Sequence, residues 1–223
     1  HNLFSQVNIS LHGDEYKSGI YGPPSITMNG EKITLMCHKS LETTSKDLYC
    51  TMDYFPRTNN FDIKQKKAKY DFLTLISNNL VGVNMDKKAG TSFILENGTP
   101  KNIDPCWKNA TRLKNLDFRM KRTKYFTTKN KDENLAAFIA AYWDDKTNSR
   151  KIHIAVIDGM GKIIGESSHE ISYAKFVNHS YSEFKFDSEN NLYFALSSHK
   201  YGSELILFKA EAKNKYNIKT NKL

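Results

Sequence analysis

Four carboxylates are the candidates for acid–base chemistry in this sequence. Glycoside hydrolases use two carboxyl groups that lie about 5 to 10 Å apart. Such a pair would come from the ends of strands, and the candidates are Asp53, Asp104, Glu183 and Asp187. Asp187 is also explained as a turn residue, because two asparagines follow it closely. Since the chain has 24 acidic residues, we treat hydrolysis as the alternative hypothesis.

Other catalytic and metal-binding motifs are missing. The seven histidines show neither His-x-Glu nor HExxH spacing. Asp144-Asp145-Lys146 lacks the spacing and the glycine of an EF-hand loop. Asp158-Gly159-Met160-Gly161 lacks the Lys and Ser/Thr of a phosphate loop, and its residues favour a hairpin turn. There is no Gly-x-Ser-x-Gly elbow for acyl transfer. We therefore predict no metal, no cofactor and, on balance, no enzyme activity.

Three cysteines, Cys37, Cys50 and Cys106, limit the thiol chemistry. Cys37 and Cys50 flank a polar stretch that is typical of a hairpin connection, so the two residues can face each other across neighbouring strands. A disulfide there would stabilise the fold by about 3 kcal/mol, and the alternative is two buried free thiols. Cys106 follows Pro105, which argues against a regular strand at that point. The absence of a CxxC pattern argues against redox chemistry and structural zinc.

Five aromatic residues are candidates for a binding surface: Tyr142, Trp143, Tyr173, Tyr181 and Tyr201. They lie at the ends of strand-like segments or in loops, where a ring with a polar tip can contact a protein or a sugar. For each ring taken singly, a structural role is the favoured interpretation.

The net charge of +9 favours anionic partners such as sulfated glycans. The cations are 28 lysines and 5 arginines. Specific readout of nucleic acid relies on arginine forks, so nucleic acid is not the expected partner. Only residues 64–69 and 119–124 are densely basic, and the alternative is a surface that merely keeps the protein in solution. No apolar run is long enough to insert into a bilayer.

Four N-x-S/T sequons mark candidate glycosylation sites at Asn8, Asn97, Asn109 and Asn178. Chance alone gives about three in a sequence this rich in Asn, Ser and Thr, so the sequons carry little weight. An extracellular or cell-surface location is therefore predicted mainly from the disulfide hypothesis.

Hairpins recur along the chain at similar intervals. Their turns are marked by Asn29, Asn78, Asn134 and Asn190, at intervals of 49, 56 and 56 residues. Asn-Gly between alternating apolar residues is a strong hairpin signal, because both turn positions need positive φ. The paired segments are 25–28 with 33–37, 71–76 with 80–83, 116–120 with 135–143, and 183–186 with 192–196. The run 135–143 fits either a buried strand, which we favour, or a helix.

Another strand-like segment follows each hairpin, at 48–54, 91–95, 151–157 and 204–208. Three or four antiparallel strands per 50 residues are the blade of a β-propeller. We predict one all-β domain over residues 1–223, with four or five blades and a frayed tail at 213–223. A strand at 6–11 would complete the last blade and close the ring. The alternative is a β-sandwich or barrel.

The segments YGPPSITMNGEKI (21–33) and DLYCTMDY (47–54) resemble an opening blade of sialidase-like propellers. The family's arginine before the proline is absent, since Gly22 and Pro23 occupy that place. No Ser-x-Asp-x-Gly-x-Thr-Trp box is present. Without arginine clamps a sialic acid carboxylate loses its bidentate partner, so the resemblance implies a non-catalytic relative.

These observations lead to three functional hypotheses. The first is a secreted, non-catalytic binding or adhesion module that recognises a protein or glycan through propeller loops. The second is a glycoside hydrolase of propeller fold. The third is a protein that binds an anionic polysaccharide.

Overall fold

The computed structural model describes most of the strands and their tight turns. Its described residues are 25–29, 32–39, 47–68, 72–85, 90–96, 99–108, 124–144, 149–172, 179–181, 183–198 and 205–222. The described chain is almost entirely β-strand, and its one helix is the 3-10 turn η2 at Ala212–Asn214. No helix of the described residues meets the length and apolarity that a membrane span requires.

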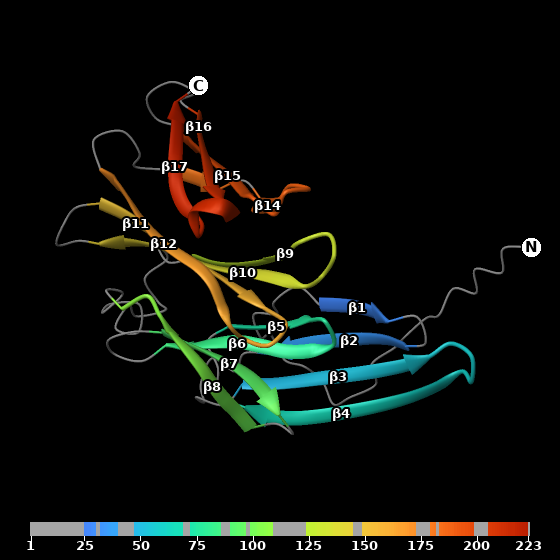
Figure 1. The fold of residues 1–223 in the computed structure, drawn as a ribbon. Coiled ribbons are helices and arrows are strands. Elements are labelled where there is room, and N and C mark those ends of the chain that lie inside the picture. Colours follow the sequence, from blue (N-terminus) through green and yellow to red (C-terminus); the bar gives the residue numbers. More distant parts are fainter. Residues whose placement is uncertain are drawn as a thin grey trace, which may run out of the picture.

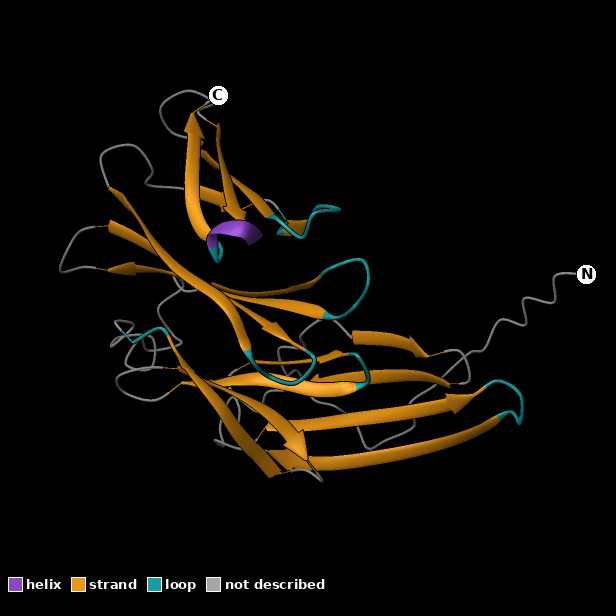
Figure 2. Ribbon diagram, in the orientation of Figure 1, coloured by secondary structure: helices purple, strands orange, loops and turns teal. Residues whose placement is uncertain are grey.

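The strands form four antiparallel sheets that follow one another in chain order (Figures 1 and 2). The first sheet holds β1 (Ser25–Asn29), β2 (Lys32–Lys39), β3 (Asp47–Phe55) and β4 (Asn60–Ala68). The second holds β5 (Phe72–Ile76), β6 (Asn79–Met85), β7 (Gly90–Glu96) and β8 (Thr99–Cys106). The third holds β9 (Lys124–Lys129), β10 (Leu135–Asp144), β11 (Ser149–Asp158) and β12 (Ile163–Ser172). The fourth holds β13 (His179–Tyr181), β14 (Lys185–Phe186), β15 (Leu192–Ser198), β16 (Leu205–Glu211) and β17 (Asn217–Lys222).

Contacts between the sheets give them the arrangement of propeller blades. The first strands of the first three sheets touch, β1 against β5 and β5 against β9, and β9 also touches β14 of the fourth sheet. The last strands also touch, β12 lying between β8 and β17. The prediction of a propeller-like arrangement with four or five blades is therefore confirmed, and the described residues form four. Among the described residues no comparable contact joins the first and fourth sheets, which lie at opposite ends of the row in Figure 1.

The hairpins follow the predicted turns. Ser77 and Asn78 have φ values of 47° and 65° between paired residues Ile76 and Asn79, as a two-residue turn with two left-handed positions requires. The third hairpin differs from the prediction. Its first strand is β9, which lies between the two segments that were predicted to pair, and residues 116–120 lie outside the described part. β9 forms because Tyr, Phe and Thr favour strands even without an alternating apolar pattern.

The predicted break at Pro105 is wrong, because β8 continues through it to Cys106. β8 is the last strand of its sheet, and an edge strand tolerates a residue without an N–H. The register shifts opposite this point, between Thr91 and Phe93. The Ser92 hydroxyl fills the gap, accepting a hydrogen bond from the Asp104 N–H at 3.1 Å and donating to the Asp104 carbonyl at 3.2 Å.

Two lysine-rich segments are edge strands. Residues 64–68 of the first basic stretch belong to β4, and lysines on an edge strand discourage pairing with other chains. Residues 217–222 form β17, paired with β16 from Ile206↔Lys222 to Glu211↔Asn217, where we expected a frayed tail. The fourth sheet thus has a last strand of its own. The predicted closing strand at 6–11 lies outside the described residues.

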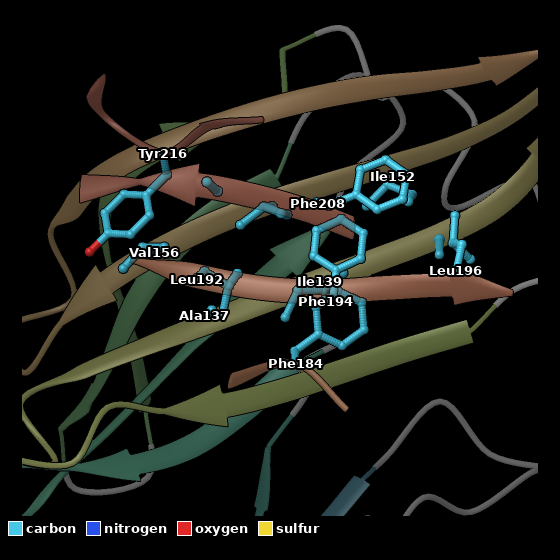
Figure 3. Close-up of a cluster of buried hydrophobic side chains, with 13 residues drawn as sticks. Ala137, Ile139, Ile152, Val156, Phe184, Leu192, Phe194, Leu196, Phe208 and Tyr216 are labelled. Atoms are coloured by element: carbon cyan, nitrogen blue, oxygen red, sulfur yellow. The ribbon is translucent and has the colours of Figure 1, made fainter. Parts of the chain in front are cut away.

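The core consists of layers between neighbouring sheets, and β10 contributes to two of them. Ala136, Phe138 and Ala140 face the second sheet, whereas Ala137 and Ile139 face the fourth. All five are fully buried. A strand that is covered on both faces is apolar throughout, so the strand interpretation of 135–143 is confirmed over the helix. Figure 3 shows the layer between the third and fourth sheets. In this layer the rings of Phe194 and Phe208 stack with their centres 4.5 Å apart.

Candidate functional site

The first two predicted carboxylates have structural partners. The Thr34 hydroxyl donates to Asp53 at 2.6 Å, and the Lys32 ammonium lies 3.1 Å from the same carboxylate. Asp104 accepts a hydrogen bond from the Ile163 N–H at 3.0 Å, across the boundary between the second and third sheets. Asp53 therefore links two strands of the first sheet, and Asp104 links the second sheet to the third.

The other two predicted carboxylates lie at the start of the fourth sheet. Asp187 caps its turn by accepting hydrogen bonds from the N–H groups of Glu189 and Asn191, at 2.9 and 2.8 Å. Glu183 forms an exposed ion pair with Lys185 at 2.9 Å. The four candidates are thus spread over three sheets, each with a local role, and this geometry gives no support to a hydrolytic acid–base pair among them.

The strongest cluster of titratable groups lies at the seam between the second and third sheets. Glu166 accepts a hydrogen bond from the backbone N–H of Trp107 at 2.7 Å, just after Cys106. The Trp107 ring lies 6.2 Å from the ring of His153, and Nδ1 of His153 lies 2.5 Å from the Ser168 hydroxyl. Trp107, Cys106 and His153 are all buried. No sequence spacing pointed to this group, because its members come from three separate strands and a turn.

Burial keeps the thiol and the imidazole at this boundary in their uncharged forms at neutral pH. Burial, with smaller contributions from the charges of Glu166 and Asp104, raises the pKa of the Cys106 thiol to about 12. Burial, and secondarily the charge of Lys151, lowers the pKa of His153 to about 4. The thiol is therefore protonated and the imidazole neutral, whereas a catalytic thiolate needs a depressed pKa. Within the described ranges, no group of three or more His, Cys, Asp or Glu is placed to hold a metal ion.

Strand register places three of the five predicted aromatic residues near one end of the third and fourth sheets. Tyr142 and Trp143 pair with Lys151 and Arg150 next to the β10–β11 connection. Tyr181 pairs with Leu196, two residues before the end of β15. We call this end the aromatic end and define it by the strand-terminal residues Asp144, Ser149, Ser172 and Ser198.

The remaining predicted site residues are placed only in part. Tyr173 follows Ser172 directly and Tyr201 belongs to the β15–β16 connection, but both lie outside the described residues. The four sequon asparagines, Asn8, Asn97, Asn109 and Asn178, lie outside them as well. Cys37 and Cys50 are direct partners in the β2–β3 register, as the disulfide hypothesis requires.

One charged group was missed from the sequence. Lys209, Lys213 and Lys219 surround Glu211 on the fourth sheet. Its only local signal is the alternation of apolar and charged residues from Phe208 to Glu211, and Lys213 and Lys219 fall within the segment that was predicted to fray.

Comparison with known proteins gives distant structural likenesses. No protein-family model matches the chain, and no curated protein matches it. The acylaminoacyl peptidase of Pyrococcus horikoshii aligns with 92% of this chain and 32% of its own, at 9% identity and a TM-score of 0.46. The β-propeller domain of the Trilobed protease from Pyrococcus furiosus aligns with 93% of this chain and 57% of its own, at 12% identity and a TM-score of 0.42. The chain thus spans about a third and somewhat over half of these two structures.

Proposed function

We propose that this propeller is a non-catalytic, extracellular binding or adhesion module that recognises a protein or glycan through its aromatic end. The observation that carries the proposal is the register that brings Tyr142, Trp143 and Tyr181 to one end of two adjacent sheets. Aromatic residues supply most of the binding energy at many interfaces, because a rigid ring covers a large area at a low entropic cost.

Three features support a binding role over catalysis. The buried thiol of Cys106 and imidazole of His153 are both uncharged at neutral pH. The carboxylates Asp53 and Asp104 are engaged in fastening strands. The sialidase-like segment at 21–33 lacks the arginine that would hold a sialic acid carboxylate.

The register of two cysteines supports the proposed extracellular location. Cys37 and Cys50 lie opposite each other on neighbouring antiparallel strands. The Cα separations of both kinds of antiparallel pair fall within the range of disulfides. A disulfide persists in an oxidising compartment, so the pairing supports secretion or exposure on a cell surface.

The test is a glycan array and an array of extracellular proteins probed with the purified chain and two variants. Trp143→Ala is expected to weaken binding to the strongest array ligand by about 30-fold, as truncation of a hot spot does. Phe55→Ala is the matched control, because Phe55 is an exposed ring at the β3–β4 turn of the first sheet, away from the aromatic end. The Phe55→Ala variant should bind like the wild type. Equal binding by all three proteins, or release of sugar from the arrayed glycans, would overturn the proposal.

A further inference from the structure

The fourth sheet has one apolar and one charged face. Leu192, Phe194, Phe208 and Ala210 are buried against the third sheet (Figure 3). Alternate residues of the same strands point to the other face, because successive side chains of a strand alternate. The register sets one row of residues across this outward face, in the order Lys185↔Tyr193, Tyr193↔Lys209 and Lys209↔Lys219.

A single carboxylate gathers three ammonium groups at one end of this row. Oxygens of Glu211 lie 3.4 Å from the Lys209 ammonium, 3.9 Å from that of Lys213 and 2.9 Å from that of Lys219. The Asn214 amide also donates to Glu211 at 2.6 Å. Glu211 balances one of these three charges, so the group retains two uncompensated positive charges.

The three lysines are held in place by more than their charges. The Glu211 side chain retains only 11% of its exposure, whereas those of Lys213 and Lys219 retain 78% and 60%. The ammonium of Lys209 lies 5.5 Å from the centre of the Tyr193 ring, within the range of cation–π attraction. The Glu211 carboxylate is thus shielded from solvent, while the ammonium groups of Lys213 and Lys219 stay accessible. Lysine side chains that are already held in position lose less conformational entropy when they bind a ligand.

We infer that Lys209, Lys213 and Lys219 form a binding site for a linear sulfated polysaccharide on the outward face of the fourth sheet. The row from Tyr193 through Lys209 to Lys219 crosses three strands and extends the site over roughly 10 Å, which suits an extended chain. All three cations of the site are lysines, which act as point charges, and arginine forks for phosphate and base recognition are missing from it. A single-stranded nucleic acid is therefore the less favoured polyanion.

The site is distinct from the aromatic end, so its test is independent of the proposed function. The variant Lys209→Gln/Lys213→Gln/Lys219→Gln removes three positive charges from the face. The control Lys101→Gln/Lys131→Gln/Lys162→Gln removes three charges from exposed lysines of the second and third sheets. Binding of a heparin oligosaccharide is measured by titration at several salt concentrations, and circular dichroism verifies that both variants are folded.

The face variant is expected to lower the slope of log affinity against log salt by about 2, since each ionic contact to a flexible polyanion contributes about 0.7. Its affinity at 0.15 M salt should fall by at least tenfold, while the control stays within threefold of the wild type.

An equal loss in both variants would overturn the site, because net charge alone would then explain binding. Tighter binding of a single-stranded oligothymidylate of equal charge than of heparin would overturn the assignment to sulfated glycan. If the face variant unfolds, the variant Lys213→Gln/Lys219→Gln, which changes only the two most exposed lysines, replaces it. A slope lowered by about 1.4 supports the site, and a slope equal to that of the wild type overturns it.

Discussion

The side-chain amide of Asn130 donates a hydrogen bond to the Oδ1 atom of Asn190 at 2.9 Å, across 60 residues of sequence. The same amide also donates to Asn134 at 2.7 Å. Asn134 and Asn190 mark the turns of the third and fourth hairpins, so the repeated turns meet in space. The second and third turns are joined in the same way, because the Ser77 N–H donates to the Glu133 carbonyl at 2.9 Å. Turn residues therefore hold neighbouring blades together as well as reversing the chain.

Replacing Asn130 with alanine should destabilise the fold markedly. Asn130 is only 3% exposed, and its Oδ1 accepts hydrogen bonds from the N–H groups of Asn134 and Leu135. The substitution leaves these donors without their acceptor, at a cost of about 2 to 3 kcal/mol in the free energy of unfolding. Urea denaturation followed by circular dichroism measures the change. Asn190→Gly, which removes a single acceptor and tolerates the φ of 62° at this position, should cost about 1 kcal/mol, and equal effects of the two variants would contradict the network.

The turns were predictable from sequence, whereas several outer strands were not. An Asn-rich turn between apolar segments is a local signal, and it located the hairpins around Asn29, Asn78 and Asn190. Strands such as β4 and β8 lie at the edge of a sheet, where lysine and proline are tolerated because one side of the strand is unpaired. Their sequences therefore lack the apolar alternation on which the prediction depended.

Gly165 lies so close to the fourth sheet that adding a single methyl group there should lower the stability of the fold. A Cβ atom on Gly165 would lie 2.5 Å from the Lys215 carbonyl oxygen and 2.9 Å from the Tyr216 ring. Gly165→Ala should therefore force the third and fourth sheets apart and lower the unfolding free energy by about 1 to 3 kcal/mol.

A matched control lies two residues away on the same strand. The hydroxyl of Ser167 is buried and has no hydrogen-bond partner among the described residues. Ser167→Ala removes this unsatisfied group, so it should leave stability unchanged or raise it by up to about 1 kcal/mol. Thermal unfolding of both variants decides the matter, and a Gly165→Ala protein as stable as the wild type would show that the two sheets can separate freely.

The cysteine pair could be predicted from the sequence, whereas the cluster between the second and third sheets could not. Cys37 and Cys50 were predicted to face each other because a single hairpin joins them, and such pairing is local. The seam of Cys106, Trp107 and His153 depends on how the second and third sheets pack. No spacing along the chain encodes that packing, so the seam became visible only in three dimensions.

The Cys37–Cys50 register predicts a disulfide in protein that has been purified without reductant. A bond between residues that are direct partners on β2 and β3 closes a hairpin loop and should contribute about 3 kcal/mol to the free energy of unfolding. Peptide mapping by mass spectrometry should find the two cysteines linked. Thiol titration in denaturant should find one free thiol, that of Cys106.

The stability effect has its own control. The Cys37→Ser/Cys50→Ser variant should unfold at lower urea concentration than the oxidised wild type and at nearly the same concentration as the reduced wild type. Three free thiols in unreduced, denatured protein would show that the cysteines remain separate.

The neutral imidazole of His153 predicts a loss of stability in mild acid. Its pKa is lowered from 6.5 to about 4, mainly by burial. The unfolded chain therefore takes up a proton as the pH falls below 6.5, while the folded chain stays unprotonated until about pH 4. The stabilisation is complete above pH 6.5 and is lost as the pH falls toward 4, which amounts to roughly 2 kcal/mol between pH 7 and 4.5.

The pH dependence isolates His153 when it is compared with that of a variant that cannot take up this proton. His153→Asn keeps a polar atom near the Ser168 hydroxyl but does not titrate in this range. Its absolute stability should be lower because the side chain is smaller, so the comparison uses only the change between pH 7 and 4.5. The variant should lose roughly 2 kcal/mol less than the wild type over this interval, as measured by urea denaturation at each pH. His169, whose pKa is also lowered by burial, is present in both proteins and cancels. Equal losses in the two proteins would mean that the seam admits a charged imidazole and that His153 is not shielded from water there.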